Sequence, residues 1–181
     1  AAECNIKKFI FTSSTRVYGK NPNGNITEKS NLSIDDNYSL VKKEIEDYLQ
    51  KVSSPEFTSC SLRISNGYGY PVIKESQCWN LVIMYACKQA FMDNKIVLRS
   101  NGEEYKDFIP ISSIVETISH FINANFDHKY QVYNVSSGNT DKIKDFLKNI
   151  IDRIYMLKKK EVKLILSDGL EKYSSFQIDN N

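Results

Sequence analysis

Proline and glycine are scarce in this 181-residue chain, with four and seven residues respectively. That content is too low for collagen-like or mucin-like sequences, and a hydrophobic fraction of 41% is too high for a disordered tail. The net charge is only +2, which argues against a dedicated nucleic-acid-binding protein, because such proteins are usually clearly basic. No stretch approaches the roughly 18 consecutive apolar residues of a membrane-spanning helix. We therefore expect a globular protein with its own core and with neither nucleic acid nor membrane as a partner.

The four cysteines, at positions 4, 60, 78 and 87, are too far apart to form a CxxC metal or redox motif. Their apolar or strand-like surroundings predict buried free thiols in a reducing compartment. The first residues, AAECNIKK, have neither the charged-then-apolar design nor the cleavage site of a signal peptide, so we expect a cytoplasmic protein. His120 and His128 have no ligand spacing around them, and no metal site is predicted.

Strand-like and helix-like segments alternate along the chain, which predicts βαβ units, a mostly parallel sheet and the α/β fold class. The expected strands cover residues 8–12, 57–64, 96–99, 108–111, 132–135 and 162–166. The expected helices run to about residue 52 from an N-cap at Asp35 or Asp36, and then cover residues 79–92, 114–122 and 143–157. The apolar face of the first helix should consist of Val41, Ile45, Tyr48 and Leu49.

Tyr38 and Lys42 lie four residues apart on the first expected helix, which places both side chains on one face, about 5–6 Å apart at Cβ. An ammonium group beside a phenol stabilises the phenolate, so Tyr38 is a candidate proton shuttle between an alcohol and a ketone. The spacing is weak evidence alone, because it recurs from Tyr70 and from Tyr155. The Tyr70 match lies in a loop before a proline, and the Tyr155 match ends a helix whose lysines complement the helix dipole.

Five motifs cover nearly the whole chain: TSSTRVYG (12–19), YSLVK (38–42), LRISNGYG (62–69), KDFIP (106–110) and YNVSSG (133–138). In this order they resemble the extended short-chain dehydrogenase/reductase family, and most closely its NAD-dependent nucleotide-sugar epimerases and dehydratases, the UDP-glucose 4-epimerase-like group. The resemblance implies the C-terminal half of a Rossmann-type doubly wound parallel sheet with a small α/β substrate-binding domain. It also implies a nucleotide-sugar substrate, bound NAD with NADP as the alternative, and a homodimer.

The resemblance implies a catalytic triad of Ser14, Tyr38 and Lys42. Ser14 would hydrogen-bond the sugar C4 oxygen, while Tyr38 takes its proton and a hydride leaves for the nicotinamide. Lys42 would also hydrogen-bond a ribose hydroxyl, and the residues expected to contact the cofactor are Ser13, Tyr38, Lys42 and Ile64. The alternative to a catalytic role is a structural one, in which Ser14 is a turn serine that hydrogen-bonds only the backbone after a strand.

The resemblance also assigns residues to the substrate, namely Ser14, Thr15, Asn66, Arg99 and Lys106. Asn66 matches a family asparagine that contacts the sugar or its diphosphate, the alternative being an ordinary turn residue. Lys106 stands where many relatives have a diphosphate-binding arginine, and a lysine cannot offer the same bidentate fork. Arg99 is a second phosphate candidate, with an exposed strand-end charge as its alternative.

Dehydratases of this group carry an Asp-Glu pair directly after the catalytic residue, whereas this chain has Thr15 and Arg16. Without a carboxylate there, 4,6-elimination is disfavoured. We predict a nucleotide-sugar 4-epimerase that oxidises C4 transiently with bound NAD. A nucleotide-sugar 4-keto-reductase or dehydrogenase using NAD(P), and a non-catalytic dinucleotide-binding relative, remain alternatives.

The seven glycines nowhere form the GxxGxxG turn with which the family binds the dinucleotide pyrophosphate. We therefore expect the chain to be truncated at its N-terminus and also at its C-terminus, and to be inactive in isolation. Residues 1–65 should form the catalytic half of a Rossmann-type domain. Residues 66–181 should form mainly the substrate-binding domain, with a segment of about 107–136 returning to the first.

Overall fold

The computed structural model describes residues 6–73, 75–169 and 173–180. The helices are α1 (Asn37–Val52), α2 (Val82–Asp93), α3 (Ile111–Asn123) and α4 (Ile143–Lys158), with short 3-10 helices η2 (Thr15–Tyr18) and η3 (Gln77–Asn80). The strands are β1 (Lys8–Ser14), β2 (Gly24–Ile26), β3 (Thr58–Ile64), β4 (Asn66–Tyr68), β5 (Lys95–Leu98), β6 (Tyr105–Pro110), β7 (Tyr130–Val135), β8 (Thr140–Lys142), β9 (Lys163–Leu166) and β10 (Phe176–Ile178). Strands and helices alternate and the paired strands β1/β3, β3/β7 and β5/β9 run parallel, which confirms the α/β fold class.

The chain divides into two compact units. Unit 1 comprises Ala1–Gly67, Asp107–Asn139 and Ser175–Asn181, and unit 2 comprises Tyr68–Lys106 and Thr140–Ser174. Strands β4 and β6 each contain the point where the chain passes from one unit to the other.

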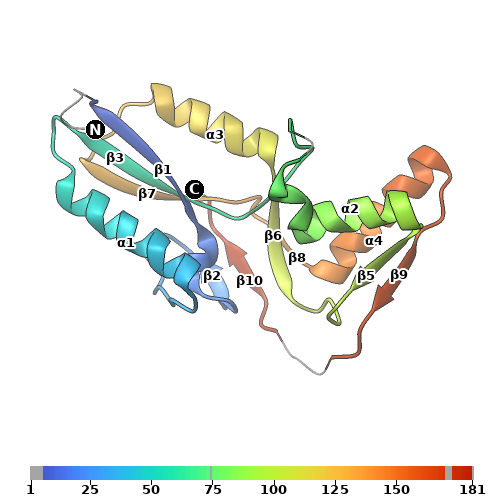
Figure 1. Ribbon diagram of the computed structural model, residues 1–181. Coiled ribbons are helices and arrows are strands. Elements are labelled where there is room, and N and C mark those ends of the chain that lie inside the picture. Colours follow the sequence, from blue (N-terminus) through green and yellow to red (C-terminus); the bar gives the residue numbers. More distant parts are fainter. Residues whose placement is uncertain (1–5, 74, 170–172, 181) are drawn as a thin grey trace. The chain divides into compact units, whose positions relative to one another are not determined.

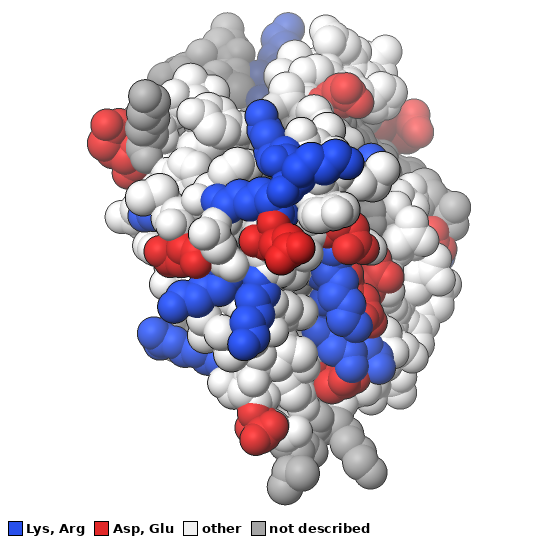
Figure 2. Space-filling view, turned by 90° about the vertical axis from the view of Figure 1, so that its right-hand side faces the viewer, with Lys and Arg blue, Asp and Glu red and all other residues white. Residues whose placement is uncertain are grey.

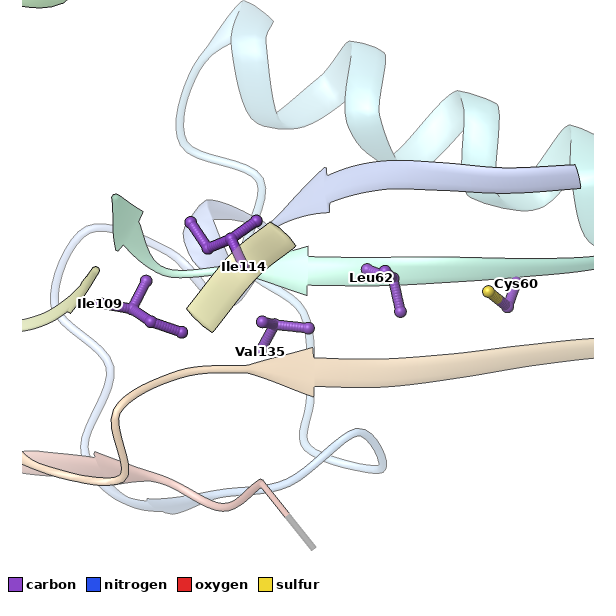
Figure 3. Packing of buried hydrophobic residues seen from close by; sticks show 5 residues of the cluster. All are labelled: Cys60, Leu62, Ile109, Ile114 and Val135. Carbon is purple, nitrogen blue, oxygen red and sulfur yellow. The ribbon is translucent and has the colours of Figure 1, made fainter. Parts of the chain in front are cut away.

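Unit 1 is built on a parallel sheet with the strand order β1-β3-β7. Parallel neighbours need a crossover connection, and α1 supplies the one between β1 and β3. Helix α1 lies on one face of this sheet and α3 on the other (Figure 1). The hydrophobic core lies on the α3 side and is formed by Cys60, Leu62, Ile109, Ile114 and Val135 (Figure 3).

The face of the sheet that meets α1 is polar and yet buried. Along β3 the side chains alternate, so that Ser59, Ser61 and Arg63 point away from the core that Leu62 joins. The Ser59 hydroxyl bonds that of Ser53, at the end of α1, over 2.6 Å. Helix α1 is therefore held on the sheet largely by hydrogen bonds rather than by an apolar stripe.

This polar layer corrects the expected apolar face of α1. Leu49 is buried at 5% exposure, but Val41 and Tyr48 are 51% and 63% exposed. The helix instead buries Ser39 and Glu46. The sheet offers Glu46 hydrogen-bonding partners in Ser13 and Arg63, whereas Ser39 bonds Asp36 at the start of the helix. Val41 and Tyr48 are left on the outer surface of unit 1.

Four short strands, β2, β4, β8 and β10, were not expected from the sequence. Strands β2 and β10 pair in parallel, Gly24 opposite Phe176, and β8 lies beside β6 in a sheet of order β4-β6-β8. The β2/β10 pair covers a small buried cluster of Val17, Tyr18, Ile26 and Ile178. Each of these strands has only three residues, which is too short for a period of two to be recognisable in the sequence.

Unit 2 contains α2, α4 and the parallel pair β5/β9, in which Ile96 stands opposite Leu164. Ile96 and Leu147 are its most deeply buried large side chains. Some expected boundaries were wrong: η3 precedes α2, which begins at Val82, and Ile111 begins α3 instead of ending a strand.

The cysteines differ in their burial. Cys60 is fully buried, whereas Cys78 and Cys87 are only half-buried, which corrects the expectation for those two. Cys4 lies outside the described residues. None of the helices in the described part of the chain is both long and apolar enough to cross a membrane.

Candidate active site

Helix α1 begins with a capping box that fixes its first turn. Asp36 accepts a hydrogen bond from the Ser39 backbone N–H over 2.8 Å, and the Ser39 hydroxyl closes back on the Asp36 backbone, which confirms the expected N-cap. The other carboxylate oxygen of Asp36 accepts from Arg16 Nε in η2 over 3.0 Å. These hydrogen bonds lower the pKa of Asp36 to about 2, and the bond from the Ser39 backbone N–H has the largest effect. Tyr38 lies in the turn fixed in this way.

The cap gives a prediction about pH. Replacing Asp36 by alanine should lower the melting temperature at neutral pH, because α1 loses a charged acceptor at its N-terminus. A carboxyl group whose pKa is lower in the folded protein stabilises the fold fully at pH values above its unfolded pKa of 3.8. That stabilisation is lost as the pH falls from 3.8 towards the folded pKa of about 2. Thermal scans of the two proteins should therefore converge across that window. A difference that stays constant down to pH 2 would contradict the assignment.

Tyr38 and Lys42 meet at the carboxyl end of β1. The Lys42 Nζ donates to the backbone carbonyl of Thr12 over 2.7 Å and lies 5.5 Å from the centroid of the Tyr38 ring. It also lies 4.9 Å from the centroid of the Phe11 ring. The Tyr38 side chain itself is 56% exposed. Open α/β sheets bind their ligands at the carboxyl ends of the strands, so the Tyr38–Lys42 pair lies where a ligand is expected.

Ser14 ends β1 and caps η2. Its Oγ accepts a hydrogen bond from the Arg16 backbone N–H over 3.2 Å, and the side chain is half-buried. A hydroxyl that accepts in this way still has its own proton to donate. Thr15 and Ile64 lie beside it in the fold, at the start of η2 and the end of the neighbouring strand β3, and both are half-buried.

Ser13 is placed differently, because its side chain points into the layer under α1. Its hydroxyl donates to Glu46 Oε1 over 2.6 Å, and both residues are buried. A cofactor contact of Ser13 would therefore use its backbone. The same carboxylate accepts from Arg63 twice, at 2.7 Å from Nη2 and 3.1 Å from Nε.

The Arg63 guanidinium extends this network to two further elements. Its Nη1 donates to the Tyr18 hydroxyl over 2.9 Å, and that hydroxyl donates to Asn134 Oδ1 over 2.7 Å. Burial alone would lower the pKa of Arg63, but the hydrogen bonds and charge of Glu46 hold it above its usual value. Burial also raises the pKa of Tyr18, against the opposing effect of Arg63.

The sequence motifs did not identify Glu46 and Arg63 as members of this network. Two features of the sequence could have identified these residues. Glu46 follows Lys42 by one helical turn and so lies on the same face of the helix, and Arg63 is a charged residue within a segment expected to be a buried strand. A charged residue in such a strand requires a buried partner of opposite charge.

Asn66 follows β3, and its side-chain amide donates to the Asp107 backbone carbonyl over 2.9 Å. Asp107 is 1% exposed, and its carboxylate accepts from the Ser65 hydroxyl and, over 2.7 Å, from the Ser137 hydroxyl. This carboxylate therefore holds together the segments that leave β3 and β7, and Asn66 with them. Asn66 itself is exposed.

The two basic candidates belong to unit 2. Lys106 forms an ion pair with Glu104 at 2.5 Å, and Arg99 is exposed directly after β5. The other predicted site residues belong to unit 1, where Ser14, Tyr38 and Lys42 lie at the carboxyl end of β1. Within the described ranges, no group of three or more His, Cys, Asp or Glu side chains could hold a metal ion.

Unit 1 also contains a cavity of about 770 Å³ at the amino ends of β1 and β3. It is lined by Lys8, Phe57, Thr58 and Phe126 among others, and by none of the predicted site residues. Because ligands of parallel α/β sheets bind at the carboxyl ends, we do not assign this cavity to the reaction.

Solved structures resemble the chain over nearly its full length. The UDP-N-acetylglucosamine 4-epimerase of Methanobrevibacter ruminantium M1, solved with UDP-N-acetylmuramic acid, matches with 26% identity and a TM-score of 0.76, covering 97% of this chain and 55% of that one. The UDP-glucose 4-epimerase of Thermotoga maritima matches with 19% identity and a TM-score of 0.74, covering 98% and 56%. The dTDP-glucose 4,6-dehydratase of Bacillus anthracis, solved with NAD, matches with 21% identity and a TM-score of 0.69, covering 96% and 53%.

The chain thus spans about half the length of these solved proteins. The two matches below 25% identity show the fold alone. No curated protein matches the sequence. The pattern described as the NAD dependent epimerase/dehydratase family matches residues 1–136, a segment that includes β1, α1 and β3 and all of the predicted site residues. The chain therefore belongs to the NAD dependent epimerase/dehydratase family.

Proposed function

We propose that this chain carries the catalytic group of a nucleotide-sugar 4-epimerase, formed by Ser14, Tyr38 and Lys42. The observation that carries the proposal is the pairing of an exposed tyrosine with a lysine ammonium 5.5 Å from its ring, at the carboxyl end of a parallel strand. Family membership and the likeness to the 4-epimerase of Methanobrevibacter ruminantium support it. Unit 1 would form the catalytic half of a Rossmann-type domain, and unit 2 the small substrate-binding domain.

The residues of the chain would act on the C4 hydroxyl of the sugar. Ser14 donates a hydrogen bond to the C4 oxygen, and Tyr38 takes the proton from that oxygen as C4 is oxidised to the ketone. The Lys42 ammonium, held by the Thr12 carbonyl, stabilises the tyrosinate. When the ketone is reduced on its opposite face, Tyr38 returns the proton and the epimeric alcohol is formed.

NAD supplies the hydride acceptor and donor for this reaction. Residues that fit its nicotinamide half are present, since Tyr38 and Lys42 lie at the strand end and Ile64 ends the adjacent strand. A GxxGxxG turn for the pyrophosphate does not occur among these 181 residues. We assign Tyr38, Lys42, Ile64 and the backbone of Ser13 to the cofactor, with NAD favoured over NADP by the family description.

The substrate would be a nucleotide diphosphate sugar. We assign Ser14, Thr15 and Asn66 to its sugar end, and Arg99 and Lys106 to the diphosphate. Positions 15 and 16 carry no carboxylate, and Arg16 is engaged with Asp36, so the acid needed for a 4,6-elimination is lacking at those two positions. The free thiols at Cys60, Cys78 and Cys87 suit a cytoplasmic location.

The experiment is a panel of UDP-, GDP-, CDP- and dTDP-sugars incubated with the full-length protein. Product identity and the absorbance of the reduced cofactor are followed together. An interconverted sugar without net change of the cofactor is expected. A stoichiometric change that requires added NAD(P) or NAD(P)H would identify a 4-keto-reductase or dehydrogenase instead. No reaction by the folded protein would favour a non-catalytic dinucleotide-binding relative.

We further propose that the outer face of α1 joins two copies of the protein. Val41, Tyr48 and Val52 are exposed at spacings of seven and four residues, so they form one apolar stripe. Two such stripes are self-complementary about a twofold axis. Replacing Val41 and Tyr48 by glutamate should convert a dimer into a monomer in sedimentation experiments. The same change at the exposed Met92 of α2 is the control, and an unchanged sedimentation coefficient in the double variant would contradict the dimer.

A further inference from the structure

Two successive turns of α1 are bonded to two successive residues of β1. Lys42 Nζ donates to the Thr12 carbonyl over 2.7 Å, and Glu46 accepts from the Ser13 hydroxyl over 2.6 Å. Tyr38, Lys42 and Glu46 are spaced by four residues each and so share one face of the helix. The bond at Glu46 therefore fixes both the rotation of α1 and its position along β1.

The Glu46 carboxylate also bonds β3, through Arg63. Its Oε1 accepts from Arg63 Nε and its Oε2 from Arg63 Nη2, so both oxygens are used and the pair is bidentate. Glu46 is 3% exposed and Arg63 5%. Within the described part of the chain, every buried side-chain nitrogen and oxygen has a hydrogen-bonding partner, so this network is fully satisfied. A satisfied, bidentate, buried network leaves α1 little freedom to rotate or slide.

We propose that Glu46 is a positioning residue for the catalytic pair, setting the rotation of α1 that carries Tyr38 and Lys42 to the end of β1. The inference rests on the proposed function of these two residues. Glu46 lies two helical turns from Tyr38 and acts through the helix, without contacting substrate or cofactor. Because misplacement of a reacting group by about 1 Å costs roughly 10²-fold in rate, a small rotation of α1 is sufficient for a large effect.

Replacing Glu46 by glutamine tests the proposal in the full-length protein. Glutamine keeps an acceptor for Ser13 but loses the charge and presents an N–H group to the Arg63 donors. We expect kcat to fall by about 10–100-fold while KM for the nucleotide sugar changes less than about threefold. The matched controls are Glu44→Gln, an exposed glutamate of the same helix, and Asp47→Asn, which breaks the half-exposed pair with Lys43. Neither control should change kcat.

A double variant separates positioning from stability. In Glu46→Leu with Arg63→Met both buried charges are removed, so the melting temperature should recover relative to either single change. The hydrogen bonds that orient α1 are still missing, so kcat should stay low. Recovery of kcat together with the melting temperature would overturn the proposal, because the pair would then serve stability alone. Equal kcat values for Glu46→Gln and Glu44→Gln would also overturn it.

Failure of the proposed function would look different. If the wild-type protein turned over no nucleotide sugar, hydrogen exchange of the peptide that contains Tyr38 and Lys42 would be compared between Glu46→Gln and Glu44→Gln. Faster exchange only in the Glu46 variant would support the positioning role independently of activity. Equal exchange in the two variants would overturn it.

Discussion

Replacing Tyr38 by phenylalanine should lower kcat of the full-length protein about 10³-fold while leaving its melting temperature unchanged. The phenol oxygen is the only atom removed, and general acid–base groups contribute roughly 10²–10⁴-fold to the rate. The fold should tolerate the change because the side chain is 56% exposed. Steady-state kinetics and a thermal scan of the same preparation check both parts.

Tyr48→Phe provides the matched control, since Tyr48 is an exposed tyrosine on the same helix. It should retain the wild-type kcat. Turnover by Tyr38→Phe within threefold of the wild type would remove Tyr38 from the mechanism, and the assignment of Lys42 and Ser14 with it.

Replacing Arg63 by methionine should lower the free energy of unfolding by about 3–5 kcal/mol. The change leaves the Glu46 carboxylate buried without its cation and removes the donor to the Tyr18 hydroxyl. Urea unfolding followed by circular dichroism gives the free energy directly. Loss of this size is a large share of the stability of a small protein.

Arg153→Met is the control, because Arg153 is exposed on α4. It should change the free energy of unfolding by less than about 0.5 kcal/mol. Equal losses from the two substitutions would show that the Arg63–Glu46 pair is not the main attachment of α1 to the sheet.

Local signals in the sequence were sufficient to predict the start of α1. Asp36 caps α1 as expected, and the helix ends at Val52 as expected, because capping and termination depend on neighbouring residues. The Tyr38–Lys42 contact is equally local, since four residues span one helical turn. Their chemical roles remain predictions.

Features that depend on distant residues could not be predicted in this way. Strand β10 pairs with β2, which lies about 150 residues earlier in the chain. No residue pattern in either segment indicates that the two should pair. The prediction that Val41 and Tyr48 belong to the buried face of α1 was wrong, because hydrophobic periodicity assumes that a helix packs on an apolar surface. The sheet presented Ser59, Ser61 and Arg63 to the helix instead, and Glu46 became buried.

An isotope experiment tests most directly whether C4 is oxidised and re-reduced within one active site. The full-length protein is given a nucleotide sugar that carries deuterium at C4, and both epimers are analysed by mass spectrometry and NMR. We expect the product epimer to retain the deuterium at C4, with no net accumulation of reduced cofactor, because the same hydride leaves and returns. Exchange of the deuterium with solvent, or stoichiometric release of reduced cofactor, would contradict a 4-epimerase.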